Sequence, residues 1–245
     1  MAIQPATGHS SKNKNMEKNK HTPSEAGGKT LGLVHTSATL VPVFDELCKR
    51  YLPGVKVFNI VDDSLIKNTI ACGELTPQTS KRVVNYANSA EEAGADYIMF
   101  TCSSIGPAVE TAATLAGVPV LRVDQPMADK AVASGTKIGV VATLSTTLEP
   151  TSDLVRRRAI VAGKNIELVS RLCEGAFEAL MGGDAQKHDD IVGAVLKQLA
   201  QEVDVILLAQ ASMARVVGTL SEEDKKVPIL ASPPLAMEYL AEVLK

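Results

Sequence analysis

Residues 31–42, LGLVHTSATLVP, decide the fold, because the chain repeats them at residues 138–150 as IGVVATLSTTLEP. Each copy opens with an apolar run typical of a buried strand and continues into a hydroxyl-rich loop. A second block recurs at nearly the same interval: ADYIMFTCSSI at residues 95–105 returns as VDVILLAQASM at residues 203–213. Blocks that recur in the same order at nearly constant spacing indicate two copies of one structural unit.

A third block, and the alternation of strand and helix patterns along the whole chain, agree with this duplication. VPVLRV at residues 118–123 recurs as VPILAS at residues 227–232. From Leu31 onward, short β-rich runs alternate with longer helical patterns, which is typical of βα units on a parallel sheet. The predicted strands are, in chain order, LGLVH, VKVFNI, DYIMFT, VPVLRV, KIGVVAT, IELVS, DVILLA and VPILA. We therefore predict an α/β fold of two pseudo-symmetric, four-stranded parallel-sheet halves of the flavodoxin-like type.

The repeat also sets the predicted domain boundaries. The first half is expected at residues 30–134 and the second at residues 135–245, with the last helix able to pack across onto the first half. Residues 1–29 are polar, Lys-rich and almost free of large apolar side chains. Such a segment buries too little apolar surface to offset the entropy lost on ordering, so we predict a disordered tail.

One helix can be predicted in more detail. In HDDIVGAVLKQLAQEV, residues 188–203, apolar side chains recur at helical spacing, so one face of the helix should be buried. Asp189 and Asp190 fit its first turn, where negative charge is favourable. His188, beside them, is expected on the surface.

Composition narrows the class of function. The chain has 245 residues, 45% of them hydrophobic, and a formal net charge of -3, which describes an ordinary soluble globular protein. We find neither an apolar stretch of the roughly 20 residues that cross a bilayer nor the apolar core of a secretory signal, so we expect a cytoplasmic protein without a membrane partner. Mild acidity, 3% aromatic content and the lack of Trp argue against nucleic acid as a partner. A small-molecule partner is expected.

The four cysteines show no metal-binding pattern. They form no C-x-x-C motif and have no His at ligand spacing, so we predict no metal site, and no disulfide framework is expected in a cytosolic chain. A cysteine is by default a small buried residue. We assign Cys48, Cys72 and Cys173 to packing, whereas Cys102 has a more unusual context.

The repeat predicts where a ligand would bind. Ligands of open parallel sheets bind beyond the carboxyl ends of the strands, and two halves that face each other would bring those ends into one cleft. Cys102 and Gln210 follow equivalent strands, so we expect them to face each other as the candidate catalytic pair. The candidate substrate-binding residues are small hydroxyl donors in the same loops: Thr36, Ser37, Ser103, Ser104, Thr143, Ser145, Thr146 and Ser212. Asp62 and Asp63, after the second strand, are expected to be solvated.

The residues after Cys102 favour a reactive thiol at this position. Pro107 suits the first position of a helix and Gly106 the cap before it, so Cys102 should lie just upstream of a helix N-terminus. Such a position would lower the pKa of a thiol from its reference of about 8.5 toward neutrality. With Gly106 as the cap, the hydroxyls of Ser103 and Ser104 would be free to hold a carboxylate or an enediolate.

The blocks FTCSSIGPAVE, GVPVLRVDQPMADKAV and IGVVATLSTTLEPT, with the two-fold repeat, resemble the aspartate/glutamate racemase superfamily, which includes hydantoin racemase, maleate isomerase and arylmalonate decarboxylase. The resemblance covers nearly everything after residue 30. It implies two pseudo-symmetric α/β halves with the active site between them, chemistry without metal or pyridoxal phosphate, and assembly as a homodimer. It also implies that Cys102 is the first catalytic thiol and that Ser103 and Ser104 form the dioxyanion-binding turn. Thr143, Ser145 and Thr146 would lie near the substrate carboxylate.

Gln210 departs from this family pattern. Two-base racemases of the family carry a second cysteine where this chain has Gln210. An amide cannot remove or return a proton at ordinary pH, but it can donate a hydrogen bond to a developing oxyanion. The resemblance to arylmalonate decarboxylase, which uses one cysteine, makes one-sided proton transfer an alternative, although that thiol is expected in the other half.

Three functions follow from these residues. The leading prediction is a cofactor-independent racemase or isomerase of a small carboxylic acid, with Cys102 exchanging a proton at the α-carbon. The first alternative is a single-cysteine decarboxylase or lyase acting on a hydroxy or keto acid. The second is a non-catalytic protein that keeps the pocket and binds a ligand.

Overall fold

The computed structural model describes residues 28–245, and the predicted tail lies outside them except for its last two residues. Two separate four-stranded sheets run in the orders β2-β1-β3-β4 and β6-β5-β7-β8, and all their strand pairs are parallel. The strands are β1 Thr30–His35, β2 Lys56–Val61, β3 Tyr97–Phe100, β4 Val120–Arg122, β5 Lys137–Ala142, β6 Glu167–Leu172, β7 Val205–Leu208 and β8 Ile229–Ala231. The predicted fold class is confirmed, and each predicted strand overlaps one of these eight.

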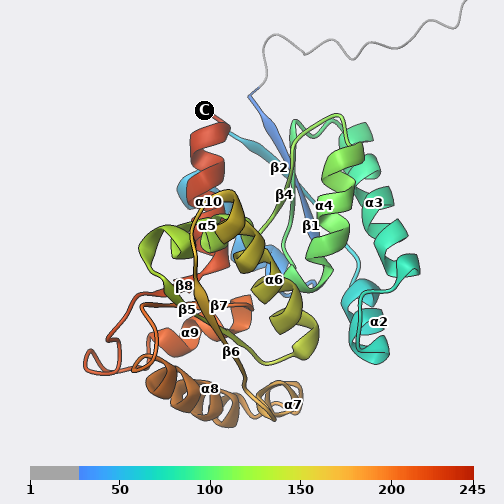
Figure 1. Ribbon diagram of the computed structural model, residues 1–245. Coiled ribbons are helices and arrows are strands. Elements are labelled where there is room, and N and C mark those ends of the chain that lie inside the picture. Colours follow the sequence, from blue (N-terminus) through green and yellow to red (C-terminus); the bar gives the residue numbers. More distant parts are fainter. Residues whose placement is uncertain (1–27) are drawn as a thin grey trace, which may run out of the picture.

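Helices connect the strands in both halves (Figure 1). They are α1 Leu40–Tyr51, α2 Ser64–Cys72, α3 Pro77–Glu92, α4 Gly106–Leu115, α5 Gln125–Ser134, α6 Ser145–Val161, α7 Ala176–Met181, α8 Ala185–Leu199, α9 Ala214–Val217 and α10 Ser232–Val243. Two short 3-10 turns, η1 Ser103–Ile105 and η2 Ala211–Met213, follow β3 and β7. Within residues 28–245, no helix combines the length and the apolar character that a bilayer crossing demands.

The two sheets repeat each other in register as well as in strand order. In the first sheet Val34 of β1 lies opposite Phe100 of β3, and in the second Val141 of β5 lies opposite Leu208 of β7. Strands β3 and β7 are buried along their whole length, as expected for central strands covered by helices on both faces. Both strands therefore end at the same level of their sheets, which fixes where the next residue emerges.

The last helix of each half packs against the other half. The helix α10 contributes Ala236, Met237 and Leu240 to the core around Leu31 and Leu33 of β1. The helix α5, by contrast, contributes its apolar residues to the core of the second sheet: Met127, Ala128, Ala131 and Val132. Figure 1 shows α5, α6 and α10 between the two sheets. The exchanged helices bury apolar surface across the boundary and join the halves.

The predicted helix at residues 188–203 begins and ends earlier than the sequence pattern indicated, because α8 spans Ala185–Leu199. Asp184 is its N-cap, and its side chain accepts a hydrogen bond from the backbone N–H of Lys187 at 3.0 Å. His188 lies within the helix, on the same buried face as Val192 and Leu196, and its exposed fraction is 0%. The expectation of a surface histidine was therefore wrong.

Candidate active site

Cys102 is the residue that leaves β3 at its carboxyl end. Its backbone is still extended, with φ -133° and ψ 122°, and the chain then turns into η1. Thr101, just before it, donates its backbone N–H to the carbonyl oxygen of Val34 at 3.0 Å, so the strand pairing holds the chain up to this point. The Cys102 side chain is half-buried and lines a cavity between the two halves of about 350 Å³.

The helix after Cys102 begins differently from the prediction. Gly106 is the first residue of α4 and not its cap, and η1 separates Cys102 from the helix. The guanidinium of Arg122 packs directly on Gly106, where a Cβ would lie 2.3 Å from the Arg122 Cζ. Glycine is needed here because of this close approach, since its φ of -50° is ordinary for any residue.

Arg122 is almost fully buried at the junction of the two halves. Its guanidinium donates two hydrogen bonds of 2.8 Å to the carboxylate of Asp124, a third to Glu110, and one to the backbone carbonyl oxygen of Pro150 in α6. Burial acts to lower the pKa of Arg122, but the charges of Asp124 and Glu110 outweigh it and raise the pKa, so the group stays ionised. The network joins β4, α4 and α6 behind the Cys102 turn.

Gln210 occupies the equivalent place at the end of β7. Its Oε1 accepts hydrogen bonds from the backbone N–H of Thr143 at 2.6 Å and from the Thr143 hydroxyl at 3.0 Å. A backbone N–H can only donate, so the carbonyl oxygen of the amide must face Thr143. The amide nitrogen then faces away, and Gln210 lines the same cavity as Cys102.

The cavity gathers most of the predicted substrate-binding residues. Its polar wall contains Thr36, Ser37, Ser103, Ser104 and Ser212, together with Thr39, Thr101, Thr147 and Ser232. The hydroxyls of Ser104 and Thr147 lie 2.7 Å apart and are buried. One of the two hydroxyl hydrogens bridges the pair, so the hydrogen bond ties η1 of the first half to α6 of the second.

Three predicted binding residues do not line the cavity: Thr143, Ser145 and Thr146. The Thr143 hydroxyl is directed to Gln210, so Thr143 acts on the cavity through that amide. Ser145 is exposed, and the Thr146 hydroxyl is buried without a partner among residues 28–245. The helix α6 begins at Ser145, and its turn brings Thr147 to the cavity instead.

Comparison with known proteins identifies the family. The sequence profile of the Asp/Glu/hydantoin racemase family matches residues 25–240, which is most of the chain. This protein belongs to the Asp/Glu/hydantoin racemase family. A search of the curated proteins finds no match. The predicted superfamily is confirmed.

Solved structures of racemases share the fold of this family member at low sequence identity. A glutamate racemase from Bacillus anthracis is 17% identical, with a TM-score of 0.66, 88% of this chain covered and 81% of that one. The allantoin racemase from Klebsiella pneumoniae is 16% identical, with a TM-score of 0.65 and coverage of 89% and 87%. The aspartate racemase of Picrophilus torridus is 18% identical, with a TM-score of 0.63 and coverage of 89% and 93%.

Sequence reasoning missed a histidine beneath the cavity of this racemase-family protein. His35 ends β1 and is fully buried, with Nδ1 2.9 Å from the Thr101 hydroxyl and Nε2 2.8 Å from Oδ1 of Asn59. Burial lowers the pKa of His35, although the hydrogen bond with Asn59 acts in the opposite direction. A neutral His35 therefore supports Thr101, the residue before Cys102. Its place at the carboxyl end of a strand was the signal available in the sequence.

The acidic residues after β2 behave differently from each other. Asp62, expected to be solvated, is largely buried: its carboxylate accepts hydrogen bonds from Ser64, Arg82 and Tyr86. Burial acts to raise the pKa of Asp62, but the hydrogen bonds from Ser64 and Tyr86 and the charge of Arg82 outweigh it, so the pKa is lowered. Asp63 is exposed, as predicted, at the rim of the cavity.

The other cysteines divide into two kinds. Cys48 and Cys173 are buried, and burial raises the pKa of Cys48 to about 11, with a contribution from the charge of Asp45, and that of Cys173 to about 12. Cys72 is exposed at the end of α2, so its assignment to packing was wrong. Among residues 28–245, no group of three His, Cys, Asp or Glu side chains could hold a metal ion.

Proposed function

We propose that this member of the racemase family is a cofactor-independent racemase or isomerase that acts on a small carboxylic acid. The observation that carries the proposal is that Cys102 and Gln210, from equivalent strand ends, line one cavity among hydroxyl donors. A thiol and an amide with hydrogen-bond donors line the same cavity, and such a pair is suited to proton transfer beside a developing oxyanion.

The reaction begins at the α-carbon of the bound acid. The thiolate of Cys102 removes the α-proton, so the S–H bond forms as the C–H bond breaks. The electron pair of that bond passes into the carboxylate, which becomes an enediolate. Return of a proton from Cys102 restores the original configuration and exchanges the proton with solvent, whereas protonation by water on the opposite face inverts the configuration. The donors that we assign to the enediolate are the hydroxyls of Ser103 and Ser104 and the Nε2 of Gln210, since all three line the cavity.

One observation favours a second candidate, a decarboxylase or lyase with a single thiol. Gln210 has no proton to exchange at ordinary pH, so only the Cys102 wall can deliver one. In the decarboxylation of a substituted malonic acid, the bond between the α-carbon and one carboxylate breaks, CO₂ leaves, and the electron pair passes into the remaining carboxylate as an enediolate. The S–H of Cys102 then protonates that carbon on one face, which gives a single enantiomer of the product.

The test is solvent exchange followed by NMR in D₂O. A panel of small amino, hydroxy, alkyl and aryl acids, together with alkyl- and arylmalonic acids, is incubated with the protein, and deuterium at the α-carbon and release of CO₂ are both measured. We expect Cys102→Ala to lower the rate by about 10²–10⁴-fold, the contribution of a positioned proton-transfer group. The matched control is Cys72→Ala, because Cys72 is exposed and outside the cavity.

The outcomes separate the candidates. Deuterium incorporation that depends on Cys102 supports the racemase or isomerase, and release of CO₂ that depends on Cys102 supports the second candidate. Equal rates in the wild type and in Cys102→Ala would show that the thiol has no catalytic role. Binding of an acid with neither reaction would make the protein a non-catalytic member of the family.

A further inference from the structure

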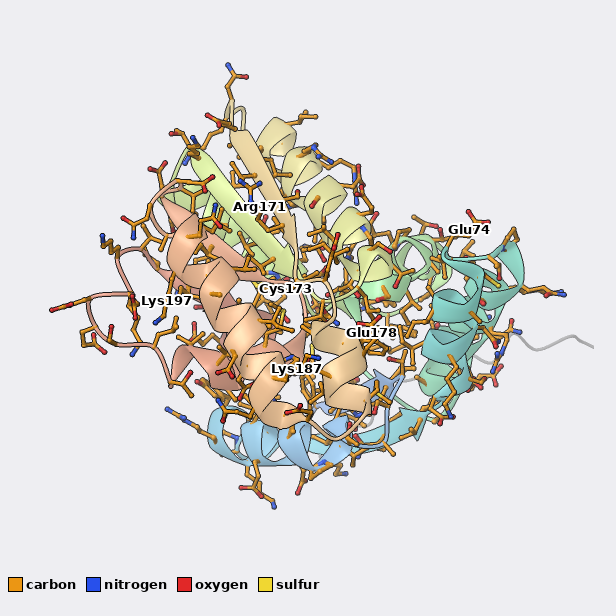
Figure 2. All side chains as sticks on the ribbon, turned by 90° about the horizontal axis from the view of Figure 1, so that it is seen from below. Glu74, Arg171, Cys173, Glu178, Lys187 and Lys197 are labelled. Atoms are coloured by element: carbon orange, nitrogen blue, oxygen red, sulfur yellow. The ribbon has the colours of Figure 1, made fainter. Side chains whose placement is uncertain are left out.

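Two short helices turn apolar faces toward the cavity. Ile66 and Ile70 of α2 are four residues apart, and so are Phe177 and Met181 of α7, so each pair lies on one face of its helix. All four side chains line the cavity, and all keep some exposure, which for Met181 reaches 69%. In Figure 2, α7, marked by Glu178, faces the helices of the first half near Glu74.

The cavity is therefore amphipathic. Its hydroxyl wall lies at the strand ends, beside Cys102 and Gln210, while its apolar wall is made by α2 and α7 and completed by Leu40 and Leu144. An apolar wall that the protein itself leaves partly uncovered gains free energy when a ligand covers it. The volume of about 350 Å³ lies at the lower end of the range for small-molecule sites.

Charge in the cavity argues against a second anionic group on the ligand. Among the cavity-lining residues that the structure describes, the charged ones are Asp63 and Lys67, and these two form an ion pair with each other. The charge of Lys67 is thus balanced by that of Asp63, which would itself repel an anion. A second carboxylate placed against Ile70 or Phe177 would lose its hydration without gaining a free counter-charge, which is costly.

We propose that the substrate is a monocarboxylic acid with an apolar substituent on its α-carbon, either branched alkyl or aryl. Its carboxylate binds at the hydroxyl wall, and its substituent lies between α2 and α7 against Ile66, Ile70, Phe177 and Met181. This assignment rests on the proposed function for the position of the carboxylate. It makes the four apolar residues the determinants of specificity.

The experiment measures binding by protection of Cys102 from iodoacetamide. It uses the full chain with Cys72→Ser, because Cys72 is exposed, whereas Cys48 and Cys173 are buried with raised pKa values. Phenylacetate, isovalerate, succinate and acetate are titrated, and the labelling rate gives each dissociation constant. We expect phenylacetate and isovalerate to bind at least about tenfold more tightly than succinate and acetate, as for other apolar groups in apolar pockets.

Variants locate the effect on the apolar wall. Phe177→Ala and Ile70→Thr should each weaken phenylacetate binding by about tenfold and leave acetate binding unchanged. The matched control is Leu115→Ala, since Leu115 is an apolar side chain that is 65% exposed and lies outside the cavity.

The outcomes are distinct from those of the proposed function. Succinate binding as tightly as phenylacetate, or protection by neither acid, would overturn the assigned substrate class. Phenylacetate protection that disappears in Phe177→Ala supports the class even if no acid exchanges its α-proton, in which case it is the proposed function that fails. If α-proton exchange proceeds with dicarboxylic acids and not with apolar monocarboxylic acids, the proposed function stands and the assigned substrate class is wrong.

Discussion

The turns after β3 and β7 have nearly the same backbone and different chemistry. Cys102 has φ -133° and ψ 122°, Gln210 has φ -132° and ψ 138°, and a 3-10 turn follows each. The strand pairing that leads to them is also equivalent, because Thr101 and Ala209 donate their N–H groups to Val34 and Val141 at 3.0 and 2.9 Å. The duplicated frame thus places a residue on each wall of the cavity, and the side chain alone decides what that residue can do.

A second difference lies just behind the two turns. The first half packs Arg122 against Gly106, whereas the repeat aligns Ala231 with Arg122 and Ala214 with Gly106 in the second half. The second half has no arginine at this place, so it needs no glycine to make room for one. The buried arginine and its carboxylate partners Asp124 and Glu110 therefore lie in the half that carries the thiol, although Arg122 also reaches the carbonyl oxygen of Pro150 in the other half.

The largest expected effect comes from placing a thiol on both walls of the cavity. Gln210→Cys places a thiol opposite Cys102 and should raise the rate of racemisation by about 10²–10⁴-fold, because a positioned proton donor then serves the second face. Chiral analysis of an acid found to exchange in D₂O measures it. Gln210→Ser is the matched control and should show no gain, and a gain in the serine variant would mean that pocket size, not the thiol, is responsible.

Removal of the buried Arg122 guanidinium should lower the free energy of unfolding more than removal of the more exposed Arg157 guanidinium in the second half. Arg122→Met leaves Asp124, which has no exposed surface, without its partner and should lower the free energy of unfolding by about 3–5 kcal/mol. Urea unfolding measures the change. Arg157→Met breaks more exposed ion pairs with Glu110 and Asp153 and should cost at most about 1 kcal/mol. Equal losses in the two variants would contradict the assigned role of Arg122.

Adding a methyl group at Gly106 should lower the stability of the protein more than removing one at the equivalent Ala214. Gly106→Ala drives a Cβ into the Arg122 guanidinium and should lower the free energy of unfolding by about 1–3 kcal/mol. Ala214→Gly should cost about 0.5–1 kcal/mol, through backbone entropy alone. In an Arg122→Met background, Gly106→Ala should lose most of its cost. A cost that persists there would place the steric conflict elsewhere.

The smallest effect concerns pH and the histidine beneath Cys102. The pKa of His35 is lowered in the folded state by burial, so below its unfolded value of about 6.5 the unfolded chain binds the extra proton more readily. Stability should therefore be full above pH 6.5 and fall as the pH drops below it, by at most about 1.4 kcal/mol per pH unit. Thermal unfolding of the wild type and of His35→Gln measures this. An identical slope in both proteins would exclude His35 as the source.

Much of the fold could be predicted from the sequence, because it depends on local patterns. The eight strands follow from apolar runs that must be buried, and the two-fold repeat follows from blocks such as residues 31–42 and 138–150. The helix boundaries were less accurate. Asp184 caps α8 four residues before the predicted start, and His188 lies on the buried face of the helix and not at its exposed end.

The sequence by itself determined the two parallel-sheet halves and the equivalence of Cys102 and Gln210, since repeated patterns of apolar and polar residues produce repeated strands. Only the tertiary structure decided that Thr147 reaches the cavity and Ser145 does not, that His35 supports Thr101, and that α2 and α7 supply an apolar wall. These relations depend on how helices rotate and pack across the boundary between the halves. Packing of that kind is set by contacts between residues far apart in the chain, which local patterns do not encode.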